Sequence, residues 1–295
     1  MSPANVPAFV YQQAATVEEA CCLLAEHRSD SKILAGGTDI LVKMKHRREV
    51  PSYLVNIKGI PGLDHIEYEP GEGLRLGPLV TIESLKRSPV VGKQYPMLHE
   101  AAAYMATISI RNRATVAGNI CNGSPSAETA PALIVLGATV RITGPGGERV
   151  VAVEDFFTGP GSTVLEPEEI VVEIQVPEAP ADSAGVYEKY SLRRMDVAMV
   201  GVASLVIPDG EICGDVRIAL SAVAPTPIRA RKAEEVLRRA APTEKVVAAA
   251  ARAAAEEARP ITDIRGSAAS RREIVQQLTA EVLRRSLTAA KLGVE

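Results

Sequence analysis

The sequence predicts an α+β protein of two or three domains, and three observations lead to that expectation. The chain has 295 residues, about twice the ~100–200 residues of a typical domain. Short segments of alternating polarity, typical of strands, recur between residues 32 and 223 and alternate with helical patterns. The segment from residue 229 onward is helical in composition. A chain of this length can bury a sizeable core.

The first helix is predicted from a capping box. The side chains of Thr16 and Glu19 can satisfy free N–H groups of a first helical turn, and apolar residues follow them. This helix is expected to end near His27. The segment 32–44 then has the order strand, glycine loop, helix.

The middle of the chain alternates between short strands and helices. Helices are expected after the hydroxyl cap Thr81, over residues 96–106 and from Ala127. A loop rich in glycine and asparagine is expected over 115–119. The predicted strands cover residues 53–57, 74–76, 138–143, 148–153 and 170–176.

A domain boundary is predicted at residues 177–183, a stretch of proline, alanine and polar residues between two strand-like segments. Strands are expected beyond it over residues 186–191, 197–207 and 216–223. The last helix is predicted to begin at Ser270, with Glu273 in the capping-box position. Its apolar face is formed by Ile274, Leu278, Val282, Leu283 and Leu287.

Composition excludes several classes of function. The formal charge of −3, from 33 basic and 36 acidic residues, gives no electrostatic case for nucleic-acid binding. Three Phe, seven Tyr and no Trp argue against base-stacking platforms. The four cysteines form no C-x-x-C pair and no cluster with histidine, so we expect no metal site in this chain.

The sequence shows neither a signal-peptide pattern nor an apolar run long enough to span a membrane. The N-terminal stretch has neither a basic region nor an apolar core of the signal-peptide kind. The longest apolar run, over 131–140, is far shorter than the ~20 residues that span a bilayer. A reducing, cytoplasmic setting without a membrane span is therefore expected.

Two glycine-containing loops carry the chemistry. In the first, Gly36 and Gly37 allow consecutive backbone N–H groups to turn towards one point, where they could cradle a phosphate, with Thr38 as a further donor. Asp39 would have to face away from such a phosphate. The second loop, over 115–119, offers another glycine, a hydroxyl and an amide. The chain contains neither the Rossmann fingerprint nor a P-loop, so those two nucleotide-binding modes are excluded.

These residues resemble a known family. The motifs are AGGTDIL at 35–41, IRNRATVAGNICNG at 110–123 and SPSAE at 124–128. Together they look like the FAD-binding medium subunit of molybdenum hydroxylases. Four further segments are similar to the same family in the same order, at 157–161, 168–170, 187–196 and 223–229. The motifs at 119–123 and 224–227 are most similar to those of bacterial xanthine dehydrogenase flavoprotein subunits, and the chain is also similar to carbon monoxide dehydrogenase medium subunits.

The resemblance implies a fold. It predicts an FAD-binding domain of the vanillyl-alcohol-oxidase (PCMH) type, built from two α/β lobes over residues 1–57 and 58–177. A C-terminal domain of antiparallel strands and helices would follow over residues 184–295.

The resemblance also implies where FAD would bind. The backbone of the first loop would wrap one side of the FAD diphosphate, and residues of the second loop would cover its other side. A third set of residues would line the ribityl and isoalloxazine part of FAD. The first set is Ile33, Leu34, Ala35, Gly36, Gly37, Thr38, Asp39 and Ile40; the second is Ala114, Thr115, Gly118, Asn119 and Asn122; the third is Glu128, Val171 and Lys189. Arg193, Arg194 and Asp196 match a cluster near the flavin face where a nicotinamide would approach.

Several of these positions allow alternatives. Lys189 could stabilise the negative charge of a reduced flavin, or it could be an ordinary surface lysine of a strand. Ala117 stands where the family often has glycine, and Glu128 replaces the usual aspartate. Cys121 could anchor a flavin covalently, although a small buried thiol is the commoner role.

The resemblance implies a relay of electrons. A large molybdopterin-binding subunit would oxidise the substrate, a small subunit would pass electrons through [2Fe–2S] clusters, and FAD on this chain would reduce NAD⁺, in a dimer of heterotrimers. One alternative is a self-sufficient flavin reductase or oxidase of the same fold, which needs a proton donor over the flavin. The only histidines are His27, His46, His65 and His99, all before the second loop. The other alternative is a subunit that has lost its flavin.

Overall fold

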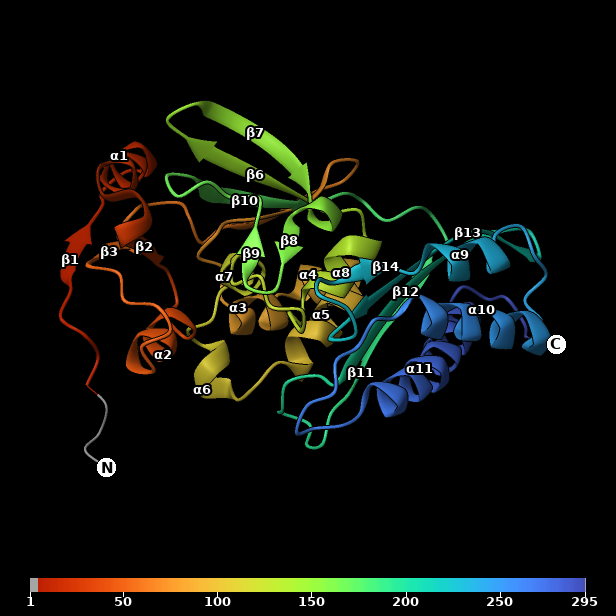
Figure 1. Cartoon of the computed structure of the whole chain (residues 1–295). Coiled ribbons are helices and arrows are strands. Elements are labelled where there is room, and N and C mark those ends of the chain that lie inside the picture. The colour runs from red at the N-terminus through yellow and green to blue at the C-terminus, as the bar shows by residue number, and fades with distance from the viewer. Residues whose placement is uncertain (1–4, 295) are drawn as a thin grey trace.

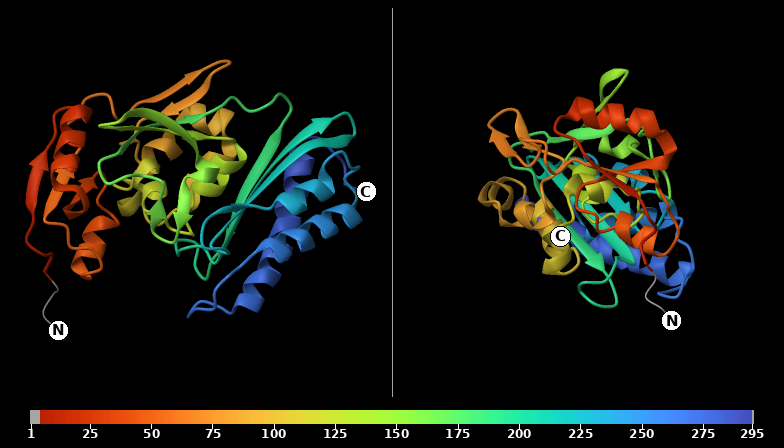
Figure 2. Two further views of the ribbon diagram at one scale, coloured as in Figure 1. Left: turned by 45° about the horizontal axis from the view of Figure 1, so that its top comes forward. Right: turned by 90° about the vertical axis from the view of Figure 1, so that its left-hand side faces the viewer.

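The computed structural model describes residues 5–294 and has three parts arranged in a row (Figure 1). The N-terminal part lies at one end, a central part follows, and the C-terminal sheet with its helices lies at the other end (Figure 2). The predicted domain boundaries after residue 57 and around residues 177–183 fall in connecting segments between strands. Residues 1–4 of the first predicted domain and residue 295 of the last lie outside the described residues.

The N-terminal part is a small parallel sheet with the strand order β1-β3-β2. Its elements are β1 (Val10–Gln13), α1 (Val17–His27), a 3₁₀ turn at Arg28–Asp30, β2 (Ser31–Leu34), α2 (Ile40–Lys45) and β3 (Tyr53–Asn56). The order strand, glycine loop, helix is confirmed for β2 and α2. Strand β1 was not predicted.

The first helix begins as expected. The Thr16 hydroxyl accepts a hydrogen bond from the Glu19 N–H at 3.1 Å. The Glu19 carboxylate accepts from the N–H of Ala15 at 2.7 Å, one residue before the cap. Helix α1 ends at His27. Its buried face, which includes Leu24, shares a hydrophobic cluster with β10 of the central sheet.

The central part is an antiparallel sheet with the strand order β4-β5-β10-β6-β7. Its strands are β4 (Ile66–Glu69), β5 (Gly73–Leu76), β6 (Thr139–Gly144), β7 (Gly147–Ala152) and β10 (Ile170–Val176), with the small pair β8 (Phe157–Gly159) and β9 (Ser162–Thr163) beside it. Its helices are α3 (Ile82–Arg87), α4 (Pro89–Gln94), α5 (Pro96–Tyr104), α6 (Ile108–Arg111), α7 (Val116–Cys121) and α8 (Ala130–Val135), with a 3₁₀ turn at Val153–Asp155.

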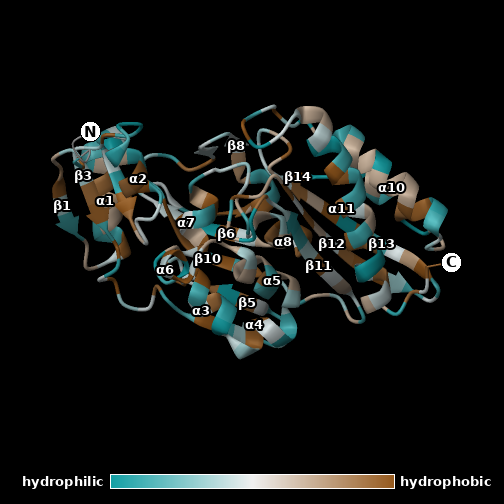
Figure 3. Cartoon of the chain, turned by 90° about the horizontal axis from the view of Figure 1, so that it is seen from below, coloured by the Kyte–Doolittle hydropathy of each residue, from teal (hydrophilic) through white to brown (hydrophobic). Residues whose placement is uncertain are grey.

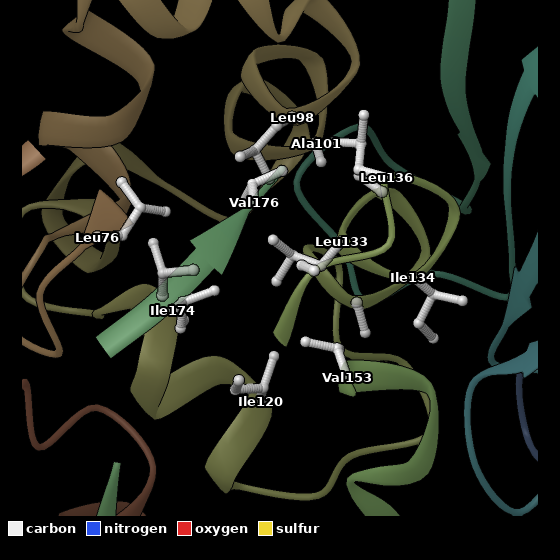
Figure 4. Packing of buried hydrophobic residues seen from close by; sticks show 14 of the residues in the cluster. Leu76, Leu98, Ala101, Ile120, Leu133, Ile134, Leu136, Val153, Ile174 and Val176 are labelled. Atoms are coloured by element: carbon white, nitrogen blue, oxygen red, sulfur yellow. The ribbon is translucent and has the colours of Figure 1, made fainter. Parts of the chain in front are cut away.

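The core of the central part lies between this sheet and its helices. Ile174 and Val176 of β10 pack with Leu133 of α8, Ile120 of α7 and Leu98 of α5 (Figure 4). All five side chains are fully or almost fully buried. This core fixes α7 in place, and α7 carries the second glycine segment.

The prediction of a loop over 115–119 is wrong, because most of this segment is the start of helix α7. Thr115 is the N-cap, and its hydroxyl accepts a hydrogen bond from the Gly118 N–H at 2.9 Å. Glycine and asparagine are poor helix formers, but the cap and the packing of Val116 and Ile120 against the core stabilise the turn.

The C-terminal part is an antiparallel sheet packed between two layers of helices. Its elements are β11 (Ala184–Tyr190), β12 (Val200–Asp209), β13 (Ile212–Ser221), β14 (Ile228–Arg229), α9 (Arg231–Leu237), α10 (Glu244–Glu257) and α11 (Ala268–Ala289). Helices α5 and α8 of the central part contact one face of the sheet, and α9 and α11 contact the other. Figure 3 shows the helices α10 and α11, of mixed polarity, beside the apolar strands.

The last helix begins earlier than predicted. The N-cap is Ser267, whose hydroxyl accepts from the Ser270 N–H at 3.1 Å, so Ser270 and Glu273 lie inside the helix and form no capping box. The predicted apolar face is largely confirmed, although Val275 is fully buried where Ile274 is only half-buried. Within residues 5–294, no helix is long and apolar enough to cross a membrane.

Candidate functional site

A large cleft lies between the N-terminal and central parts, and both glycine segments line it. Its volume is about 670 Å³, within the range of sites that hold a small molecule or cofactor, roughly 300–1,000 Å³. The lining combines apolar side chains with backbone and hydroxyl groups. This is the composition expected of a binding site for an organic molecule with polar groups at fixed points.

The first glycine segment presents free backbone donors to this cleft. In the part of the chain that the structure describes, the N–H groups of residues 36–40 donate no hydrogen bond to another protein group. Gly37 has a φ of 76°, in the left-handed region that favours glycine. Consecutive free N–H groups around such a turn form a concave surface that suits an anion.

Gly36 is required for a different reason than the sequence suggested. Its φ is not positive, but a Cβ atom at this position would lie 2.0 Å from the Arg113 carbonyl oxygen and 3.1 Å from the Ala114 Cα. Both neighbours are backbone atoms of the central part. The absence of a side chain at Gly36 therefore allows the two parts to meet along the cleft.

Two polar contacts hold the first segment in position. The Asn122 amide donates to the Asp39 carboxylate at 3.2 Å and so joins α7's C-terminal end to the first segment. The cleft wall desolvates Asp39 and raises its pKa, against the opposing charge of Lys43. The Lys58 ammonium donates to the carbonyl oxygens of Leu34 and Ala35, at 3.3 and 3.1 Å.

The second side of the cleft is formed by the start of α7. The Gly118 N–H is already bonded to Thr115, so it is not a free donor. The N–H of Ala117 has no partner within residues 5–294. Ala117 lies in the first turn of α7 without a positive φ, so a methyl group is tolerated where the family often has glycine. The Asn119 side chain accepts from the Thr129 N–H and hydroxyl and so positions the start of α8.

A buried ion pair supports the neighbouring wall. Arg111 donates to the Glu83 carboxylate at 2.8 Å and to the carbonyl oxygens of Met105 and Ala106, both at 3.0 Å. The Arg111 guanidinium lowers the pKa of Glu83. Met105 and Ala106 line the cleft, and Ala106 has a positive φ of 41°. The pair thus fixes a strained segment of the cleft wall.

Glu128 in the cleft lining and Lys189 form a buried ion pair, and the Lys189 ammonium also donates to the Asp196 carbonyl oxygen at 2.9 Å. The Glu128 side chain is 9% exposed and that of Lys189 only 1%. Lys189 is therefore not a surface lysine. Glu128 lines the large cleft, whereas Lys189 lines a second cavity of about 210 Å³ together with Tyr104 and Arg194. Burial raises the pKa of Glu128 to about 7, although the Lys189 charge opposes this.

The segment after β11 lies at the edge of the site. Arg193 and Asp196 are exposed and do not line the cleft, whereas Val197 does. Arg194 lies over the ring of Tyr104, with its Cζ atom 5.5 Å from the ring centre.

The structure brings most of the predicted cofactor residues together in one cleft. Leu34 lies in β2 outside the lining, and Lys189 lies behind Glu128. The predicted residues that line the cleft are Ile33, Ala35, Gly36, Gly37, Thr38, Asp39, Ile40, Ala114, Thr115, Gly118, Asn119, Asn122, Glu128 and Val171.

The cleft has a third wall, formed by the β8–β9 turn, which the sequence analysis did not predict. Gly161, Ser162 and Thr163 line the cleft from the β8–β9 turn, and Gly161 donates its N–H to the Gly123 carbonyl at 2.8 Å. The motif at 157–161 was the available signal. The two cations Lys32 and Lys43, which line the cleft and lie near Glu49, were also missed.

The lining of the cleft bears on covalent attachment of flavin at Cys121 and on a histidine proton donor. Burial raises the pKa of Cys121 to about 12, which disfavours the thiolate that covalent attachment requires. Among the described residues that line the cleft there is no histidine. No group of three or more histidine, cysteine or acidic side chains in residues 5–294 is arranged to hold a metal ion.

The size of the cleft and its free backbone donors suit an organic cofactor that carries a phosphate group, and comparisons with known proteins show which family the chain belongs to. Residues 7–179 match the family described as FAD binding domain in molybdopterin dehydrogenase, and residues 185–286 match the CO dehydrogenase flavoprotein C-terminal domain. The chain therefore belongs to the FAD-binding medium subunits of molybdenum hydroxylases, and it is a subunit of an oxidoreductase.

Two relatives and one solved structure illustrate the similarity. The chain is 34% identical to the putative xanthine dehydrogenase FAD-binding subunit XdhB of Escherichia coli, over 95% of this chain and 96% of that protein. It is 36% identical to the carbon monoxide dehydrogenase medium chain of Hydrogenophaga pseudoflava, over 96% and 97%. A structure of the H. pseudoflava carbon monoxide dehydrogenase, lacking the Mo-pyranopterin moiety of its cofactor, superimposes with a TM-score of 0.94, with 36% identity over 97% of this chain and 99% of that one.

Proposed function

We propose that this chain holds FAD in the cleft and relays electrons from [2Fe–2S] clusters of a partner subunit to NAD⁺. The observation that carries the proposal is the row of free N–H groups over residues 36–40 at the cleft wall, which suits the FAD diphosphate. When bound, FAD supplies the exchange between one-electron and two-electron carriers.

The residues of the chain have distinct tasks in this proposal. The N–H groups from Gly36 to Ile40 bind the diphosphate, and Thr38 adds a hydroxyl. The second side comes from Ala114, Thr115, Gly118, Asn119 and Asn122, although the Gly118 N–H is engaged by Thr115. Val171 and Glu128 line the ribityl and isoalloxazine end, with Lys189 behind Glu128. Arg193 and Asp196, both exposed, are assigned to the approach of the nicotinamide.

The partners follow from the same proposal. A large molybdopterin-binding subunit and a small [2Fe–2S] subunit would complete the complex, as a dimer of heterotrimers. The four cysteines are free thiols, which suits a reducing compartment. We favour a xanthine or purine dehydrogenase complex because of the motifs at 119–123 and 224–227. A carbon monoxide or aldehyde dehydrogenase is the alternative, and the identities of 34% and 36% do not separate the two classes.

Anaerobic mixing of the FAD-loaded chain with NADH tests the relay. A relay subunit accepts electrons from NADH without any organic substrate, so the flavin absorbance near 450 nm is expected to bleach. A self-sufficient flavin oxidase of the same fold would instead be reduced by its own organic substrate and not by NADH. Flavin that stays oxidised with NADH, but is reduced by a low-potential protein donor, would contradict NAD⁺ as the acceptor.

A further inference from the structure

We infer that Glu128 is a proton acceptor in the cleft wall whose uptake of one proton accompanies reduction of the bound FAD. The inference rests on the proposed function, because it requires FAD in the cleft. It differs from the expectation that Lys189 acts directly as the cation beside the flavin.

The arrangement of the ion pair carries the inference. Glu128 lines the cleft, and Lys189 does not. The carboxylate therefore lies between the ammonium and the space for the cofactor. With Glu128 ionised, the pair has no net charge, and Lys189 offers little stabilisation to a negative group in the cleft. With Glu128 protonated, the pair carries one positive charge. Protonation of Glu128 thus decides whether the Lys189 charge acts on the cleft.

Lys189 is the charged group that acts most strongly on Glu128. From β11, Lys189 and Tyr187 face Glu128, and the Glu128 charge contributes to the raised pKa of Tyr187. From the segment after β11, only the Asp196 carbonyl oxygen enters the pair, since its side chain is exposed. The remaining ionisable side chains that line the cleft are Arg28, Lys32, Asp39, Lys43, Glu49, Cys121, Glu166 and Glu169.

The sign of the effect follows from burial. Burial raises the pKa of Glu128 to about 7, so the carboxyl is protonated below that pH and ionised above it. Adding negative charge to the cleft raises this pKa further. Glu128 thus has one pKa with oxidised FAD and a higher pKa with reduced FAD. At a pH between these two values, reduction of FAD draws a proton onto Glu128, whereas below pH 7 the proton is already present.

The step balances. Two electrons and one proton convert FAD into its anionic two-electron-reduced form, and a second proton from solvent forms an O–H bond on the Glu128 carboxylate. In the complex the electrons come from iron–sulfur donors, and in the test they come from dithionite. The hydrogen bond from Lys189 to the Asp196 carbonyl oxygen is unchanged by the step.

The test measures the midpoint potential of FAD bound to the full chain against reference dyes, from about pH 7.5 to about 9. Two protons for two electrons change the reduction equilibrium hundredfold per pH unit, which is about 59 mV for a two-electron couple, and one proton changes it tenfold, about 30 mV. We expect the steeper slope for the wild-type chain and the shallower one for Glu128→Gln. The matched control is Glu211→Gln, an exposed glutamate in the turn between β12 and β13 that does not line the cleft, which should keep the steeper slope.

A second measurement covers the case in which Glu128→Gln fails to fold or to bind FAD. Proton uptake by the wild-type chain is measured with an indicator dye in weak buffer at about pH 8 during reduction. Two protons per FAD support the inference, and one proton overturns it even if FAD is bound in full. Failure of the wild-type chain to bind FAD overturns the proposed function, and this inference with it.

Discussion

Replacement of Gly36 by alanine tests the contact on which the cleft depends. The added Cβ would lie 2.0 Å from the Arg113 carbonyl oxygen, whereas Cβ atoms essentially never come within 3.0 Å of another atom. The first segment and the central part would have to separate by about 1 Å. Neither neighbour can rotate away, because both are backbone.

The magnitude follows from overpacking. Inserting a methyl group into a tightly packed site costs about 1–3 kcal/mol. If separation of the two cleft walls absorbs this strain, FAD affinity falls about 5-fold to 140-fold, at 1.4 kcal/mol per tenfold change. Fluorescence titration of the purified chain with FAD measures the affinity, and urea unfolding of the FAD-free chain measures how much of the strain appears as lost stability.

The matched control is Gly146→Ala in the turn between β6 and β7, where an added Cβ meets nothing within 4 Å and φ is not positive. This variant should bind FAD like the wild type. Gly36→Ala with unchanged affinity and unchanged stability would refute the backbone contact as the reason for glycine.

Three further predictions concern the cleft walls. Thr115→Val removes the cap of α7 and should lower the free energy of unfolding by about 1 kcal/mol; an unchanged urea midpoint would contradict this role. Arg111→Met leaves two carbonyl oxygens without their donor and Glu83 with only its hydrogen bond from Arg87, and it should lower the free energy of unfolding by about 1–3 kcal/mol in the same assay. Because Arg111 lowers the Glu83 pKa, the difference between wild type and Arg111→Met should be present above the ordinary glutamate pKa of 4.5 and shrink as the pH falls below it; a difference independent of pH would rule out the ion pair. Asn122→Ala removes the hydrogen bond to Asp39 and should weaken FAD binding by about 1 kcal/mol, roughly fivefold, in the fluorescence titration; wild-type affinity would show that this bond does not hold the walls together.

Much of the fold could be predicted because its signals are local. The hydroxyl cap at Thr16 and the alternating strands of the C-terminal sheet each lie within a few residues of sequence. Strand β1 was missed because Val10–Gln13 is short and mostly exposed, so it lacks a buried alternation. Local propensity predicts a loop where α7 lies, because glycine and asparagine are disfavoured in helices. The core that stabilises this helix comes from distant segments.

The site was predictable as a set of residues, but not in its details. The sequence indicated the two segments that line the cleft. It could not show that Gly36 meets Arg113 or that Asn122 bonds to Asp39, because these contacts join separate parts of the chain. The sequence also could not show that Glu128 lines the cleft with Lys189 behind it, because this arrangement depends on the packing of β11 against the central part.

Hydrogen exchange of the backbone amides with and without FAD tests the central claim most directly. If the cleft binds FAD through its backbone donors, the chain binds one FAD, and amides over 36–40 exchange more slowly in its presence, while the turn at 144–147 is unaffected. Stoichiometric binding of FAD without protection of residues 36–40, or no binding of FAD at all, would contradict the account.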